Sequence, residues 1–155
     1  MSLEELERVY RTHYRTVWNV CLTFLREASD VEDAVQDTFV KLALSRRDFA
    51  DSDGVKAWLI AVAKNVCRDE LRKKRRGDLP LEEERCGSAD DPEPDETLEA
   101  VRSLNEKYRI PIYLFYYEGL STAQIARLTG RKESTVRSDL SRGRNELRRI
   151  LERSE

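Results

Sequence analysis

The chain has 155 residues, of which 39% are hydrophobic and 37% charged, so it can form one ordinary domain or two small helical ones rather than one large core. No apolar run is long enough to span a membrane, and the amino-terminal stretch is acidic and amphipathic rather than a signal peptide. We therefore expect no membrane insertion and a cytoplasmic location. The three cysteines are far apart and form no C-x-x-C motif, which argues against a disulfide framework, a zinc site or any other metal or cofactor.

The net charge of −2 conceals an uneven distribution along the chain. Residues 78–98 contain nine acidic residues and one basic residue, whereas the segments on either side are both net positive. Because a binding partner responds to the local field, the acidic overall balance does not argue against DNA binding.

Three amphipathic helices are predicted in the first half of the chain. Apolar residues recur at helical spacing from Leu3 to Phe24. Ser29 and Glu32 have the spacing of a capping box and are expected to open the second helix. We expect Asp53 to cap the third helix, which continues into the basic run at residues 68–76. Cys21 and Cys67 fall on apolar faces and are expected in the core, and the lone His13 is expected to be packed or solvated rather than a ligand.

Two of these helices have outer faces with a distinctive chemistry. The third has an apolar face with Trp58 next to Asn65 and several cations, which suits nucleic acid with separated strands; the alternative is a core helix with a solvated basic end. The second presents the acidic and amide side chains of Asp33, Gln36 and Asp37, which suit a basic protein surface but also fit an ordinary solvated face.

The segment Gly77–Glu96 has the composition of a linker, with glycine, proline, serine and many carboxylates. It predicts two domains, residues 1–77 and 97–155, joined by a flexible acidic linker at residues 78–96. No strand-like alternation is present, so the fold is predicted to be all-α. After the linker, the apolar spacing of Leu98–Leu104 predicts one helix, and a second helix is expected to have Pro111 near its start.

The run Gly119–Leu147 predicts a helix-turn-helix, the motif whose second helix enters a DNA major groove. Ser121 is expected to cap the first helix, Gly130 to form the turn, and Glu133 or Ser134 to open a second helix with a basic polar side. An ordinary helical hairpin with a solvated basic face is the alternative for this segment taken alone.

Two longer stretches resemble the extracytoplasmic-function (ECF) group of bacterial RNA polymerase sigma factors, in the sigma-70 family. Ala34–Leu42 (AVQDTFVKL) and Trp58–Arg76 (WLIAVAKNVCRDELRKKRR) are similar to sigma region 2. Lys107–Ala126 (KYRIPIYLFYYEGLSTAQIA) and Ser134–Leu147 (STVRSDLSRGRNEL) are similar to region 4. The resemblance implies two helical sigma domains in a protein that binds core RNA polymerase, directs it to promoter DNA and helps to open the −10 element. It also implies an anti-sigma factor as a partner.

The resemblance also implies roles for individual residues. The face that docks on core polymerase would comprise Asp33, Gln36 and Asp37. Recognition of the −10 element would involve the loop Phe49–Val55 together with Trp58, Asn65, Arg68, Arg72, Arg75 and Arg76. Recognition of the −35 element would involve Thr135, Arg137, Ser138, Ser141, Arg142 and Arg144.

The chain departs from the family pattern at several positions. A common Trp-Leu-Tyr-Arg run reads Trp58-Leu59-Ile60-Ala61 here, Ser134 replaces a frequent glycine, and Asn105 replaces a frequent proline. Asp139 stands where the family usually has a basic residue. Facing DNA, its carboxylate would repel phosphate or accept a hydrogen bond from a cytosine amine.

A sigma factor is not itself an enzyme, and we expect no catalytic activity because the chain has no carboxylate or His/Cys cluster able to bind a catalytic metal. The alternative function is a stand-alone helix-turn-helix regulator with a sensor or dimerisation domain in its first half. The basic third helix with Asn65 favours the sigma factor, because such a regulator does not need it.

Overall fold

The computed structural model describes residues 1–77 and 95–153, and within these ranges it contains seven α-helices and no strand. The chain divides into two compact units, the first within residues 1–92 and the second within residues 93–155. The predicted all-α fold with two helical domains is confirmed. Residues 78–94, which make up most of the predicted acidic linker, lie outside the described residues.

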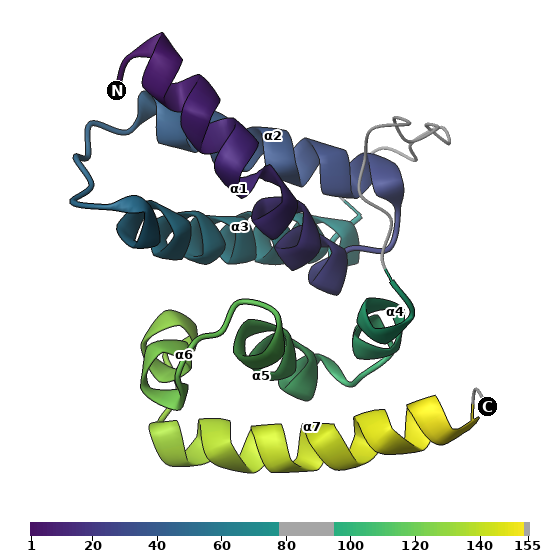
Figure 1. The fold of residues 1–155 in the computed structure, drawn as a ribbon. Helices are drawn as coiled ribbons and strands as arrows, with labels where there is room; N and C mark the ends of the chain where they lie inside the picture. Colours follow the sequence, from purple (N-terminus) through teal and green to yellow (C-terminus); the bar gives the residue numbers. More distant parts are fainter. Residues whose placement is uncertain (78–94, 154–155) are drawn as a thin grey trace. The chain divides into compact units, whose positions relative to one another are not determined.

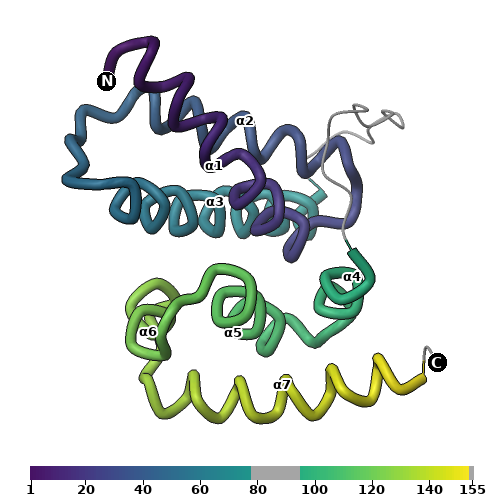
Figure 2. The backbone as a smooth tube through the Cα atoms, viewed as in Figure 1, coloured from purple at the N-terminus to yellow at the C-terminus, as the bar shows by residue number. Residues whose placement is uncertain are grey.

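The first unit is a bundle of three long helices, α1 (Leu3–Phe24), α2 (Ala28–Leu44) and α3 (Ser52–Arg75). Each helix packs against the other two, as the ribbon and the backbone tube both show (Figures 1 and 2). The buried side chains lie at the helical spacing expected for inward stripes, and they include Val17, Cys21, Val31, Val35, Leu42, Leu59, Ala63 and Cys67.

Two predicted helix starts in this unit are wrong. The N-cap of α2 is Glu27, which makes no side-chain capping bond, so Ser29 lies inside the first turn instead of forming a capping box. The N-cap of α3 is Asp51, whose carboxylate accepts a hydrogen bond from the Gly54 amide at 2.8 Å, and Asp53 lies in the first helical turn. Several residues near each start can cap a helix, so sequence pattern alone leaves the exact first residue open.

Polar and sulfur-containing side chains also join the three helices. His13 is buried, with its Nε2 atom 3.2 Å from the Ser52 hydroxyl at the start of α3. The buried carboxylate of Asp30 pairs with Lys74, which ties the start of α2 to the end of α3. Cys21 and Cys67 are free and fully buried, as expected. The hydrogen bond between the two thiols, together with burial, raises the pKa of Cys21.

The second unit contains α4 (Glu96–Arg102), α5 (Glu106–Tyr116), α6 (Thr122–Thr129) and α7 (Glu133–Arg153). Helix α5 packs across α7, and α4 and α6 each pack against both of them (Figure 1). The core of this unit consists mainly of apolar side chains that these helices direct inward, including Val101, Ile112, Tyr113, Leu114, Ile125, Val136 and Leu140.

The helix-turn-helix forms as predicted. Ser121 caps α6 in a complete capping box with Gln124, and Gly130 ends that helix with φ at 70°, in the left-handed region that favours glycine. Helix α7 begins at Glu133. The expectation for Pro111 is wrong, however, because α5 begins five residues earlier at Glu106, with Asn105 as its N-cap, and Pro111 lies inside the helix.

No helix in the described parts of the chain has both the length and the apolar character needed to cross a membrane.

Candidate functional site

The outer face of α3 gathers most of the residues assigned from the sequence to −10 recognition. Trp58, Asn65, Arg68, Arg72 and Arg76 follow one another at spacings of seven, three, four and four residues, which places them on one side of the helix. Asn65 and the arginines are exposed, and Trp58 is partly buried. The buried stripe of α3 occupies the opposite side, so the bundle fixes this face outward.

An aromatic pair lies at the amino-terminal end of this α3 face. Phe49, in the loop between α2 and α3, meets Trp58 edge-on with ring centroids 5.9 Å apart. Both side chains are only partly buried. Because aromatic rings offer stacking surfaces that suit any base, the pair supplies the apolar part of a site for an unstacked nucleotide, and Asn65 supplies an amide two turns further along.

The residue that replaces the family's frequent arginine near this site is Ala61, which lies on the same side of α3 between Trp58 and Asn65. Its neighbour Ile60 is fully buried. Position 61 therefore offers no cation near the exposed face, and position 60 belongs to the core of the bundle.

A second outer face, on α2, carries acidic and apolar groups. Gln36 and Asp37 are exposed, and Asp33 is partly buried beside them. Val40 and Leu44 continue the same side of the helix and are 53% and 78% exposed. The face therefore combines negative charge with exposed apolar surface.

Glu70 on α3 belongs to the same acidic neighbourhood, and the sequence reading did not identify it. Burial raises its pKa; Lys73 opposes this shift, and the carboxylates of Asp30, Asp37 and Asp33 add to it. Lys74, one turn beyond Glu70 on α3, pairs with Asp30 of α2, which places this part of α3 beside that helix. Only the packing of α3 against α2 brings these residues together, so no sequence spacing could have indicated the cluster.

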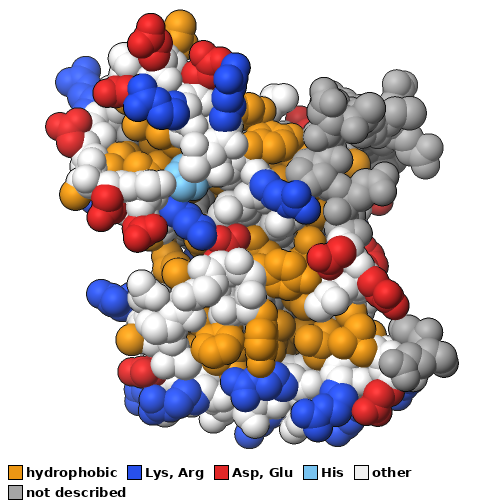
Figure 3. All heavy atoms as spheres, in the orientation of Figure 1, with side chains coloured by type: hydrophobic (Ala, Val, Ile, Leu, Met, Phe, Trp, Pro, Cys, Tyr) orange, Lys and Arg blue, Asp and Glu red, His pale blue; other side chains and the backbone are white. Residues whose placement is uncertain are grey.

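The exposed side of α7 carries the residues assigned to −35 recognition. Arg137, Ser138, Ser141 and Arg142 are exposed, and Arg142 lies one helical turn beyond Ser138. Thr135, on the flank of this side, is partly buried. In the space-filling view, Lys and Arg side chains gather along α7 (Figure 3). Such a basic side on the second helix of a helix-turn-helix suits contact with a DNA groove and its phosphates.

Glu133 organises the start of α7. Its Oε1 atom accepts a hydrogen bond from the Thr122 hydroxyl of α6 at 2.7 Å and lies 3.3 Å from Arg137 Nη1. One carboxylate therefore links the first turns of both helices of the motif and holds the guanidinium of Arg137 in an exposed ion pair.

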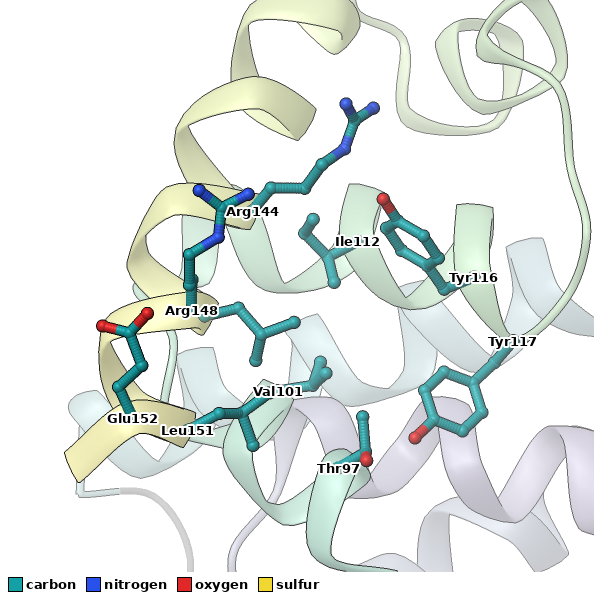
Figure 4. A pocket seen from close by; sticks show the side chains of 10 residues that line it. Thr97, Val101, Ile112, Tyr116, Tyr117, Arg144, Arg148, Leu151 and Glu152 are labelled. Carbon is teal, nitrogen blue, oxygen red and sulfur yellow. The ribbon is translucent and has the colours of Figure 1, made fainter. Parts of the chain in front are cut away.

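Arg144 has different surroundings from the other assigned α7 residues. Its guanidinium lies 5.9 Å from the ring centre of Phe115 and 6.0 Å from that of Tyr116, both on α5. It borders an open pocket of about 570 Å³ between α4, α5 and the second half of α7 (Figure 4). Thr97, Val101 and Leu151 contribute to the same lining.

The structure corrects the interpretation of Asp139. Its side chain is 1% exposed and forms an ion pair with Arg131, so it does not face DNA and can neither repel phosphate nor bind a base. Its position in α7, three residues after Val136 and four before Gly143, places it on the inward stripe. The motif resemblance drew attention to the charge at this position but could not indicate its direction.

Gly143 is a further residue that the sequence reading missed. A Cβ atom at this position would lie 2.7 Å from Ile112 Cγ1 and 3.1 Å from Tyr108 Cβ, so α7 and α5 approach closely here. A glycine inside a helical pattern with charged neighbours is the signal that could have indicated it. In the described ranges, no group of three or more His, Cys, Asp or Glu side chains is arranged to hold a metal ion.

Comparison with protein families and curated proteins agrees with this arrangement. Residues 9–77 match the family described as Sigma-70 region 2, and residues 95–147 match Sigma-70, region 4. The chain is 30% identical to the ECF RNA polymerase sigma factor SigL of Mycobacterium tuberculosis, in an alignment covering 95% of this chain and 89% of that protein. It is 26% identical to the RNA polymerase sigma factor CarQ of Myxococcus xanthus, covering 96% and 90% of the two chains.

Solved structures share the fold. The sigma factor RpoE of Bartonella quintana, in complex with the anti-sigma factor NepR, aligns with a TM-score of 0.76 at 23% identity, covering 97% of this chain and 98% of that one. CnrH, in complex with the cytosolic domain of CnrY, aligns with a TM-score of 0.69 at 23% identity, covering 99% and 92%.

Proposed function

Because the chain belongs to the ECF group of sigma factors and thus directs transcription initiation, we propose that its two helical units divide promoter recognition between them. The observation that carries the function is the presence of both sigma regions, in order, in one chain. A stand-alone regulator is not favoured, because it would leave the region 2 unit unexplained. Residues 1–77 would act at the −10 element and on core polymerase, residues 97–155 would act at the −35 element, and residues 78–96 would link them.

Three chemical features of α3 support its assignment to −10 recognition. The partly buried aromatic pair of Phe49 and Trp58 can stack on an unpaired base, and the exposed Asn65 amide can hydrogen-bond to a base edge. The cations that continue along this side neutralise phosphates and would hold the strand in register. The assigned residues are Trp58, Asn65, Arg68, Arg72, Arg75 and Arg76.

The acidic outer face of α2 is proposed to bind core polymerase. Asp33, Gln36 and Asp37 would face a basic protein surface, and acidic groups suit such a partner because they repel DNA and steer association with a cationic surface. The exposed Val40 and Leu44 add apolar area that a protein partner could cover.

The exposed side of α7 is proposed to read the −35 element in the major groove. Arg142 and Ser138 would face base edges from successive turns, and the Glu133–Arg137 pair would orient one guanidinium at the entrance of the groove. The full set of assigned residues is Thr135, Arg137, Ser138, Ser141, Arg142 and Arg144, of which Arg144 would act from the flank of the helix, next to Phe115 and Tyr116.

The remaining assignments follow from the family. We place the protein in the cytoplasm with RNA polymerase, without catalytic activity of its own, since the polymerase carries out the chemistry. The complexes of RpoE with NepR and of CnrH with CnrY support an anti-sigma factor as a further partner of this chain.

In vitro transcription tests the proposal directly. The purified chain is added to core RNA polymerase on a library of promoter fragments with randomised −35 and −10 elements, and the initiated transcripts are sequenced. We expect initiation only when the chain is present, with enrichment of two sequence elements. Sequence-specific DNA binding without core polymerase, and no initiation with it, would instead identify a stand-alone regulator.

A further inference from the structure

A buried ion pair joins the turn of the helix-turn-helix to the inward side of α7. Arg131, directly after the turn glycine, has its Nη1 atom 3.1 Å from Asp139 Oδ2, and Asp139 is 1% exposed. Lys107 of α5 approaches the other carboxylate oxygen at 4.0 Å. A carboxylate this deeply buried requires such partners, because an unpaired charge in the interior is strongly unfavourable.

Arg131 also donates a hydrogen bond to a backbone carbonyl of α5 whose usual helical donor is missing. Its Nη1 atom donates a hydrogen bond to the carbonyl oxygen of Lys107 at 3.0 Å. In a regular helix this carbonyl would accept from the amide four residues later, but that residue is Pro111, which has no N–H. One guanidinium nitrogen therefore bonds to both α5 and α7.

The backbone of Arg131 is held as well. Its amide donates to the carbonyl oxygen of Ala126 in α6 at 3.1 Å, next to the left-handed Gly130. Through its backbone and its side chain, Arg131 thus contacts all three helices that surround the turn. One turn beyond Asp139, the close approach at Gly143 leaves α7 no room to shift toward α5.

We propose that Arg131 and Asp139 are positioning residues that set the orientation of α7 for −35 recognition, although neither contacts DNA. The inference rests on the proposed role of α7 as the −35 reader. The charge at position 139 is opposite to the one usual in the family, and the arginine in the turn is its counterpart in this chain. A small rotation of α7 about its axis would move Ser138 and Arg142 from the base edges toward the phosphates. DNA binding would then persist with less preference for the −35 sequence.

The test compares −35 dependence in variants of the full chain assembled with core polymerase. Initiation is measured on a promoter selected by the wild-type protein and on the same promoter with its −35 element replaced. For Arg131→Met and Asp139→Asn we expect the preference for the intact element to fall about tenfold, because a reoriented α7 would lose about one base contact. The double variant is expected to be no worse than either single variant, because both remove one interaction.

Lys132→Met is the matched control, since it removes one positive charge from the exposed neighbouring position in the same turn. It is expected to keep the −35 preference. The dependence of promoter binding on salt should be unchanged in Arg131→Met; a slope reduced by about one would show that Arg131 contacts phosphate and would overturn the proposal. Arg131→Lys, which can still donate hydrogen bonds to one of the two acceptors, is expected to restore part of the preference.

Circular dichroism and thermal unfolding separate positioning from stability. Variants that unfold earlier but keep the wild-type −35 preference at a temperature where they are folded would show that the pair is only structural. If Asp139→Asn does not fold, the combination of Arg131→Met with Asp139→Leu removes both charges. We expect this double variant to fold and still to lack the −35 preference. A wild-type −35 preference in the double variant would refute the proposal. If the wild-type protein itself shows no −35 dependence with core polymerase, the proposed role of α7 fails instead.

Discussion

Replacing Gly143 by alanine tests the close approach of α5 and α7. In an exposed helix the change would stabilise by about 1 kcal/mol, because alanine has the higher helix propensity. Here the new Cβ atom would lie 2.7 Å from Ile112 Cγ1, 3.1 Å from Ile112 Cδ1 and 3.1 Å from Tyr108 Cβ. Ile112 is fully buried, so it cannot turn outward to relieve these contacts.

Overpacking of a core typically costs about 1–3 kcal/mol, and the shortest contact is with an atom near the branch of the isoleucine rather than with its flexible end. The 2.7 Å contact puts the cost in the upper part of this range, about 2–3 kcal/mol. Subtracting about 1 kcal/mol for helix propensity, we expect Gly143→Ala to lower the free energy of unfolding of the second unit by about 1–2 kcal/mol. Asn145→Ala, at an exposed position two residues later, is the control and should be neutral or stabilising by up to about 0.7 kcal/mol.

The measurement can separate the two units because Trp18 and Trp58, the two tryptophans of the chain, lie in the first one. Urea unfolding followed by tryptophan fluorescence should be unaffected, whereas far-ultraviolet circular dichroism should show an earlier transition for the second unit. Ile112→Ala removes both Cγ1 and Cδ1, so combined with Gly143→Ala it should cost less than the sum of the single variants. A Gly143→Ala protein as stable as the Asn145→Ala control would refute the reasoning.

Four further predictions concern the proposed interfaces and one cluster of charges. Asn65→Ala should remove a base contact of about 1–3 kcal/mol and therefore slow promoter opening more than it weakens polymerase binding. A premelted template should partly rescue the variant, and equal defects on duplex and premelted templates would show that Asn65 is structural. Asp37→Lys should weaken core polymerase binding in a pull-down or polarisation assay while the fold persists, and Asp48→Lys, the same exchange in an exposed loop, should not; normal binding by the first variant would exclude the α2 face. Arg142→Ala should cost about 1–3 kcal/mol and relax one base position in a promoter library, whereas a uniform loss with a smaller salt slope would indicate a phosphate contact. Burial raises the pKa of Glu70, so its ionised carboxylate destabilises the folded state at pH 7 but not near pH 4, where it is protonated. Glu70→Gln should therefore raise the free energy of unfolding of the first unit at pH 7 and leave it unchanged near pH 4. An equal difference at both pH values would contradict this.

The buried side of Asp139 changes the interpretation of Arg142. A carboxylate facing the groove would have altered the electrostatic field around Arg142, but Asp139 is directed inward and paired with Arg131. Arg142 therefore remains exposed on a basic surface, and the promoter-library experiment alone can distinguish base from phosphate contact.

Local signals in the sequence were sufficient to predict much of this protein. Helical periodicity indicated the inward stripes, because a side chain's place on a helix depends only on its spacing from its neighbours. The N-cap at Ser121 and the turn at Gly130 were predicted correctly, since both depend on bonds within a few residues. For the same reason, Trp58, Asn65 and Arg68 could be assigned to one helix before the structure was known.

Tertiary packing decided what such short-range signals leave open. Asp51 and Asp53 are both good caps, and the position at which the loop enters the bundle selects Asp51. Pro111 lies inside α5, and Arg131, distant in sequence, donates a hydrogen bond to the carbonyl that the proline leaves open. A carboxylate can be buried only where a partner of opposite charge reaches it. For Asp139 that partner is Arg131, and only the folded arrangement of α7 and the turn brings the two side chains together.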